Sequence, residues 1–140
     1  MIFILSLFLL TACDKTSEAP KHELLFLAKG VKVDAQAKLL WQDQAINKNN
    51  EQTWSKAQEY CQNLVIDDFI EWRLPTRVEL EHLITQKHRL DEIALFSYWS
   101  ATKFQTKRDT AYFSYFGDGC LRNNASMQKH YLVRCVHSSL

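Results

Sequence analysis

The clearest pattern of hydrophobic and polar positions is a helical one near the middle of the chain. Leu80, Leu83 and Ile84 follow one another at the i, i+3, i+4 spacing that forms a single apolar stripe. Thr76 is a good N-cap for this helix, and Glu79 stands three residues later, where its carboxylate can reach back to the N–H of the cap. The pattern predicts a short amphipathic helix that begins with a capping box.

A second helix is predicted upstream, over Trp54–Leu64, with Thr53 as its N-cap. Its apolar face comprises Trp54, Ala57, Tyr60 or Cys61, and Leu64. Because Cys61 falls on or beside this face, we expect it to point into the core.

Short apolar or alternating runs, bounded by turn residues, predict the strands. They are Leu24–Val33 (one or two strands), Lys38–Gln42, Tyr98–Thr102, Ala111–Phe116 and His130–Val136, the last with Tyr131, Val133 and Cys135 on one face. The polar stretches between them predict loops at Ile46–Glu51, Lys103–Asp109 and Leu121–Gln128, and a turn at Gly117–Gly119. Two early helices followed by strands indicate an α+β domain, with two helices packed on a small antiparallel sheet and with long loops.

The first twelve residues differ from the rest, because they are almost wholly apolar and carry no charge. Their length is typical of a signal peptide and too short for a bilayer span. Leu10–Cys13 resembles a lipobox, in which the cysteine is acylated and becomes the first residue after cleavage. We therefore expect a signal peptide at 1–12, a lipidated Cys13 and tether at 13–23, and the domain at 24–140. An N-terminal core element is the alternative, and the missing basic residues leave an upstream start codon open.

Acylation of Cys13 implies attachment to a lipid bilayer in the bacterial cell envelope. Asp14 follows the cysteine directly, which in lipoproteins of the enteric type implies the inner membrane, facing the periplasm; the outer membrane remains an alternative. The formal net charge is +1, so nothing requires a nucleic-acid partner.

The cysteine count agrees with export. If Cys13 is acylated, an odd number remains, Cys61, Cys120 and Cys135, and a disulfide between two of them is expected to persist in the periplasm. The third would be free, buried or paired with another chain, which would make an oligomer. No C-x-x-C or H-x₃-H spacing supports a zinc site, so we expect neither a metal nor a cofactor.

Four segments together resemble the Lcl C-terminal domain family, named for a domain of a bacterial collagen-like adhesin. They are W-x-x-A-x-x-Y-C-x-x-L (Trp54–Leu64), WRLPT-x-x-EL (Trp72–Leu80), YWSAT (Tyr98–Thr102) and VRCV (Val133–Val136). The resemblance covers roughly Gly30 to His137. It implies a C-type-lectin-like fold, in which a cysteine of the first helix bonds a cysteine of the last strand, here Cys61 and Cys135. It also implies that strands from the two ends of the domain pair.

The same resemblance implies a binding role, but the chain lacks the Glu-Pro-Asn, Gln-Pro-Asp and Trp-Asn-Asp strings that hold Ca²⁺ in sugar-binding C-type lectins. The loops instead offer a basic rim with aromatic faces, suited to a polyanionic glycan or an envelope protein. The candidate ligand-binding residues are Trp99, Lys103, Phe104, Lys107, Arg108, Arg122 and Lys129. The alternative is an ordinary solvated loop.

Two other roles remain open. One is a structural component of an envelope complex that binds no small ligand. The other is a thiol-dependent enzyme using Cys120. We expect no enzyme and no catalytic residue, because no serine or cysteine nucleophile motif frames any of the five histidines.

Overall fold

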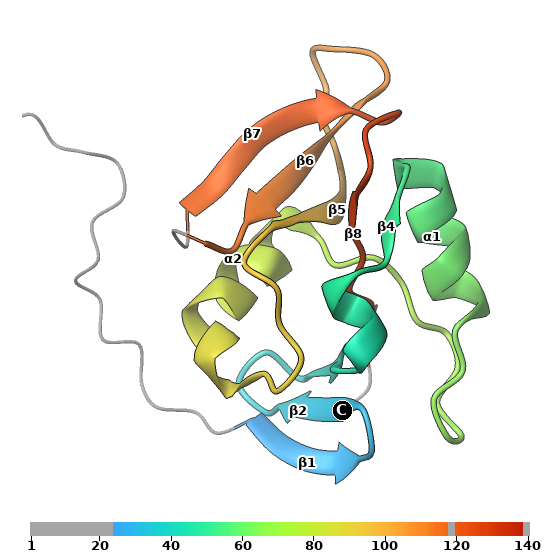
Figure 1. Cartoon of the computed structure of the whole chain (residues 1–140), viewed down its shortest axis with the longest axis vertical. Coiled ribbons are helices and arrows are strands. Elements are labelled where there is room, and N and C mark those ends of the chain that lie inside the picture. Colours follow the sequence, from blue (N-terminus) through green and yellow to red (C-terminus); the bar gives the residue numbers. More distant parts are fainter. Residues whose placement is uncertain (1–23, 118–119, 139–140) are drawn as a thin grey trace, which may run out of the picture.

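The computed structural model describes residues 24–117 and 120–138, with two helices and two sheets (Figure 1). The first sheet contains β1 (Leu24–Ala28), β2 (Val31–Asp34), β3 (Leu39–Gln42) and β9 (Val136–His137), in the order β1-β2-β3-β9. The second contains β4 (Glu51–Gln52), β8 (Tyr131–Leu132), β5 (Ser97–Lys103), β6 (Thr110–Tyr115) and β7 (Cys120–Ser126), in the order β4-β8-β5-β6-β7. The helices are α1 (Trp54–Asn63) and α2 (Arg77–Gln86), with short 3₁₀ turns η1 (Ala45–Lys48) and η2 (Lys87–Arg89).

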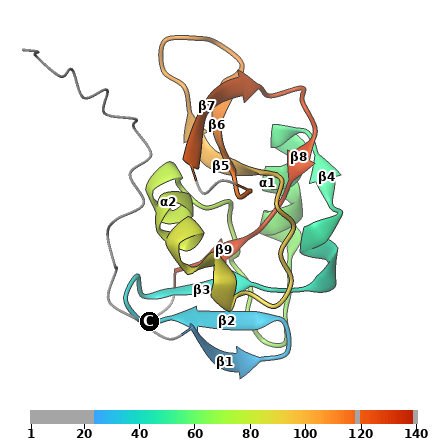
Figure 2. The same cartoon turned by 60° about the vertical axis from the view of Figure 1, so that its left-hand side comes forward.

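The α+β class is confirmed, and its strands form two sheets, of four and five strands. The predicted closing strand His130–Val136 is split into β8 and β9, which belong to different sheets. β8 runs parallel to β5, so the five-stranded sheet is mixed, and β9 pairs antiparallel with β3. The pairing of a late strand with an early one, implied by the family resemblance, is thus present (Figure 2).

The chain leaves both sheets between β8 and β9. Val133, Arg134 and Cys135 lie in this gap and all three are buried. We expected alternate residues of this segment, Val133 and Cys135, to point inward. Arg134 between them is buried as well, so the inward and outward alternation of a strand does not hold here.

The capping box of α2 is confirmed. The Thr76 hydroxyl accepts a hydrogen bond from the N–H of Glu79 (3.2 Å), and the Glu79 carboxylate accepts one from the N–H of Thr76 (2.7 Å). The same carboxylate accepts hydrogen bonds from both terminal nitrogens of the Arg73 guanidinium, at 2.7 and 2.8 Å. Leu80, Leu83 and Ile84 are buried, as the stripe predicts.

Helix α1 begins where predicted, at Trp54, but the Thr53 side chain makes no capping hydrogen bond. The first N–H of the helix, that of Trp54, donates instead to the carbonyl of Met127 (3.0 Å). A tertiary contact with the turn after β7 therefore satisfies this donor. Of the two residues left open for the inward face, Cys61 is the buried one.

The disulfide implied by the family resemblance is present, with a Cα–Cα distance of 5.5 Å between Cys61 and Cys135. It joins α1 to the buried segment between β8 and β9. The side chain of Cys120 and all of residues 1–23 lie outside what the structure describes.

The buried side chains form two clusters, one beside α1 and one beneath α2. The first contains Trp54, Ala57, Cys61, Trp72, Trp99, Val133 and Cys135, among others. The second contains Trp41, Leu80, Leu83, Tyr98, Phe116 and Leu132, among others. Helix α2 thus packs on both sheets, whereas α1 is fixed by the disulfide and the first cluster.

Two predicted loops carry regular structure. Residues 46–51 include most of η1 and the start of β4, and 121–126 belong to β7 rather than to a loop. β7 pairs only with β6 and forms an edge of its sheet, where a strand can be polar. Within the described residues, no helix has the length and apolar character needed to cross a membrane.

Candidate ligand-binding surface

The connection between β5 and β6 projects from one end of the molecule (Figure 1). Its base is closed by a hydrogen bond from the N–H of Phe104 to the carbonyl of Thr110 (3.0 Å). The Thr110 hydroxyl donates to the carbonyl of Lys107 (2.7 Å), and Asp109 takes a left-handed φ of 55° to complete the turn. Lys107 and Arg108 are exposed on this loop.

The turn between β7 and β8 lies beside this loop, because the N–H of Met127 donates to the carbonyl of Asp109 (2.9 Å). It presents Lys129, which is exposed. Lys103, at the end of β5, is exposed as well, and its Nζ lies 5.4 Å from the centroid of the Trp54 ring.

Four exposed cations thus share one end of the molecule, and we call Lys103, Lys107, Arg108 and Lys129 the basic end. Among the described side chains, none forms an ion pair with any of the four. Their charges are therefore available to an external anion. The side chain of Arg122, also predicted to bind ligand, lies outside what the structure describes.

An aromatic and cationic stack borders the basic end. The ring of Phe104 meets that of Tyr112 edge to face, with centroids 5.3 Å apart, and Phe104 is half-buried. The guanidinium of Arg77, from the first turn of α2, lies 4.5 Å from the centroid of the same Tyr112 ring. Sequence reasoning missed the contact of Arg77 with Tyr112, because it depends on how α2 packs against β6.

The prediction that Trp99 offers a stacking face to a ligand is wrong. Trp99 has no exposed surface, its indole N–H donates to the carbonyl of Gln52 (2.8 Å), and its ring packs on that of Tyr131 (4.7 Å between centroids). The alternation along β5 directs this side chain into the core.

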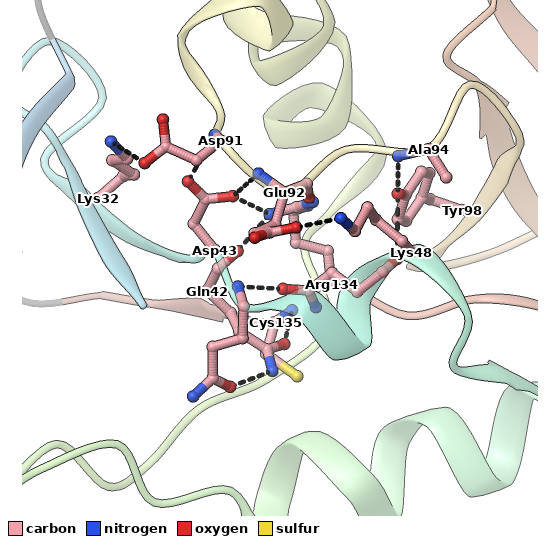
Figure 3. A network of polar contacts seen from close by, with 12 residues as sticks. Lys32, Gln42, Asp43, Lys48, Asp91, Glu92, Ala94, Tyr98, Arg134 and Cys135 are labelled. Carbon is pink, nitrogen blue, oxygen red and sulfur yellow. Dashed lines mark hydrogen bonds and ion pairs between the residues drawn. The ribbon is translucent and has the colours of Figure 1, made fainter. Parts of the chain in front are cut away.

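A second concentration of charge includes the buried side chains of Arg134 and Asp43 (Figure 3). The Arg134 guanidinium is fully buried and lies 3.3 Å from the Asp43 carboxylate. It also donates to the carbonyls of Gln42 and Glu92. Asp43 in turn accepts the N–H groups of Asp91 (2.8 Å) and Glu92 (2.9 Å).

This cluster fixes the segment that leads into β5. Two ion pairs extend it to the surface: Lys32 with Asp91 (2.8 Å), and Lys48 with Glu92 (2.5 Å). Since its buried charges bond to one another and to the main chain, the arrangement fits a structural role rather than ligand binding.

One histidine is held by a buried carboxylate. The Nε2 of His82 lies 2.6 Å from the Asp34 carboxylate, which also accepts the N–H of Ala37 (3.0 Å) and the indole N–H of Trp41 (3.4 Å). The pair links α2 to the hairpin of β2 and β3. No group of three or more potential metal ligands occurs among the described residues.

The sequence of the Lcl C-terminal domain matches residues 30–137, which include α1, α2 and every strand but β1. The chain belongs to this family. The Lcl C-terminal domain is a domain of bacterial surface proteins. No curated protein matches the chain.

Proposed function

We propose that this Lcl C-terminal domain is a binding module of the bacterial cell envelope that recognises a polyanionic glycan through its basic end. The observation that carries the proposal is the basic end itself. Two hydrogen-bonded loops hold exposed cations together, and no described side chain neutralises Lys107, Arg108 or Lys129.

The chemistry of the basic end suits sulfate or carboxylate groups spaced along a chain. Exposed lysines and arginines attract such a polymer at long range and bond its anionic groups on contact. The loop is anchored at Phe104 and Asp109, which limits the conformational entropy lost on binding. The partly exposed ring of Phe104, which packs on Tyr112 beside the basic end, is the aromatic group that a sugar ring would contact.

The proposed location follows from the N-terminal residues. An acylated Cys13 would anchor the domain to a bilayer, with Asp14 favouring the inner membrane and the periplasmic side. The role proposed is binding without catalysis, and no nucleic-acid partner is required.

The proposal is tested with a sulfated polymer and its uncharged parent. We expect dextran sulfate to bind the protein and dextran not to bind. Two exposed cations are worth about 0.5–1 kcal/mol each, so Lys107→Gln/Arg108→Gln should weaken the affinity about 5- to 30-fold.

The matched control is Lys29→Gln/Lys38→Asn, which removes two exposed cations from the turns of the first sheet, away from the basic end. Lys38 has a left-handed φ of 55°, which asparagine tolerates. The control should bind as the wild type does. An equal loss of affinity in both variants would show that binding depends on the net charge of the protein and not on the basic end. If no anionic glycan binds, the proposal is refuted and a purely structural role is favoured.

A further inference from the structure

A small hairpin between α1 and α2, Leu64–Glu71, projects from the molecule, and we call it the finger (Figure 1). Its two arms are joined by reciprocal hydrogen bonds: the N–H of Ile66 donates to the carbonyl of Phe69 (3.1 Å), and the N–H of Phe69 donates to that of Ile66 (2.9 Å). Asp67 and Asp68 form the exposed tip.

The base of the finger is firmly held. Ile66 is buried, and Phe69 packs edge to face on the ring of His137 (5.9 Å between centroids). The Trp72 indole N–H donates to the carbonyl of Phe69 (3.0 Å). The finger is therefore presented as a fixed shape.

Its other face is apolar and open to solvent. Val65 is 60% exposed and Ile70 is 56% exposed. Val65 and Ile70 are the pair of positions next to the bonded pair Ile66 and Phe69. In a hairpin, such neighbouring pairs point to opposite faces, so Val65 and Ile70 lie together on the exposed face and form one patch. Core packing does not explain them.

The backbone of the finger is unusual. Asp67 has a φ of 50° and Glu71 a φ of 65°, both in the left-handed region. Aspartate adopts this conformation readily, but for a glutamate it costs about 1–2 kcal/mol. Such strain persists where the surroundings impose it, and it is concentrated at functional sites.

The finger is also uniformly acidic. It contains Asp67, Asp68 and Glu71, and no lysine or arginine. Val65 borders a surface depression of about 460 Å³, whose wall includes Tyr60 and the ion pair of Lys56 with Glu59 (2.8 Å), so the negative charge of this surface comes from the finger itself. A partner that fits this surface must carry positive charge to face the aspartates, apolar groups to cover Val65 and Ile70, and a projecting shape that enters the depression.

The basic end has these properties. It is a projecting loop with Lys107 and Arg108 near its tip and Phe104 at its base. In both views it lies at the opposite end of the molecule from the finger (Figures 1 and 2).

We propose that the finger and its neighbouring depression bind the basic end of a second copy of this chain. Asp67 and Asp68 would face Lys107 and Arg108, while Val65 and Ile70 pack against the aliphatic parts of those side chains. Because each copy offers the two surfaces at opposite ends, the contact is head to tail and generates a chain or a ring of copies rather than a two-fold dimer. A single loop in one depression belongs to the small, transient class of interfaces.

This inference does not rest on the proposed function, although the two share the basic end. A polyanion that occupies the basic end should therefore compete with self-association. Each process can be present without the other, and separate measurements distinguish them.

The test is zero-length cross-linking of the full chain in detergent. Equal amounts of ¹⁴N- and ¹⁵N-labelled protein are treated with a carbodiimide, which joins a carboxylate to a lysine amine only at contact. We expect isotopically mixed cross-links from Asp67 or Asp68 to Lys103, Lys107 or Lys129. Their yield should fall several-fold in 0.5 M salt, where the Debye length is only about 4–5 Å, and in the presence of dextran sulfate.

Two variants separate the contributions. Val65→Ser/Ile70→Ser keeps every reactive group and should lower the mixed yield several-fold, whereas Val78→Ser, at an apolar side chain of α2 that is 70% exposed, should not. Asp67→Asn/Asp68→Asn keeps the turn and should abolish concentration-dependent association in sedimentation equilibrium.

Three cross-linking outcomes would overturn the inference. They are the absence of mixed cross-links, mixed cross-links confined to other surfaces, and a yield in Val65→Ser/Ile70→Ser equal to that of the wild type. Sedimentation that is equally concentration-dependent in Asp67→Asn/Asp68→Asn would also overturn it.

Discussion

Replacing Arg134 with methionine should destabilise the domain by about 3–5 kcal/mol. The substitution keeps most of the side-chain volume but removes the partner of the buried Asp43 carboxylate, 3.3 Å away, and the donor to the carbonyls of Gln42 and Glu92. Truncating one member of a buried ion pair typically costs this much, because the other charge stays buried without compensation. Domains of this size have about 5–15 kcal/mol of stability, so the variant should be close to unfolding.

The assay is urea denaturation followed by tryptophan fluorescence, since Trp41, Trp72 and Trp99 are fully buried. Asp43→Asn completes a double-mutant cycle. In the Asp43→Asn protein, Arg134→Met should lower the unfolding free energy by about 1–3 kcal/mol less than it does in the wild type. Lys48→Met breaks only the partly exposed pair with Glu92 and should cost less than about 1 kcal/mol. A cost below about 1 kcal/mol for Arg134→Met, or an equal cost in both backgrounds, would refute this reasoning.

Three further predictions concern the scaffold. Burial alone raises the pKa of Glu79, but hydrogen bonds from Arg73 and from the cap outweigh it and lower that pKa below its ordinary 4.5. A carboxyl whose pKa is lower in the folded state stabilises the fold at pH values above its unfolded pKa, so the unfolding free energy should fall as the pH drops through and below about 4.5. Glu79→Gln should weaken this pH dependence. A pH profile of Glu79→Gln equal to that of the wild type would contradict the prediction. Cys61→Ala/Cys135→Ala should have an unfolding free energy about 4 kcal/mol lower in the urea assay, because the disulfide joins residues 74 positions apart. A wild-type protein that is equally stable in its reduced and oxidised forms would contradict this prediction. Trp99→Phe should lose about 0.5–1.5 kcal/mol of stability with its hydrogen bond, yet bind dextran sulfate as the wild type does; weaker binding at equal folding would make Trp99 a ligand contact after all.

The features that the sequence predicted well are local ones. The capping box at Thr76 and Glu79 depends on two residues three positions apart, and the structure reproduces it atom for atom. The start of α1 at Trp54 was also predicted, but not how its first N–H is bonded. That bond comes from Met127, far along the chain, and no local pattern contains it.

The division into two sheets was not predicted, because the sequence does not show that the chain leaves the ladder around Arg134. The run from His130 to Val136 alternates like one strand. In the folded chain Arg134 turns inward to meet Asp43, and the segment around it leaves the ladder, so that the two short strands on either side join different sheets. Arginine is rarely buried, and sequence reasoning gave no partner for it.

The candidate site was predicted in part. Lys103, Lys107, Arg108 and Lys129 are exposed, as a binding rim requires, and the two loops that carry them are bonded to each other. Trp99 was misassigned because an aromatic-rich strand does not reveal which of its alternating faces is buried.

The central claim, that the basic end binds a polyanion, is tested most directly by measuring the affinity for dextran sulfate as a function of salt. Each neutralised anionic group of a linear polyanion contributes about 0.7–0.9 to the slope of log Kd against log salt concentration. We predict a steep positive slope for the wild type, and a slope lower by about 1.5 for Lys107→Gln/Arg108→Gln. An affinity independent of salt, or the same slope in both proteins, would contradict the account.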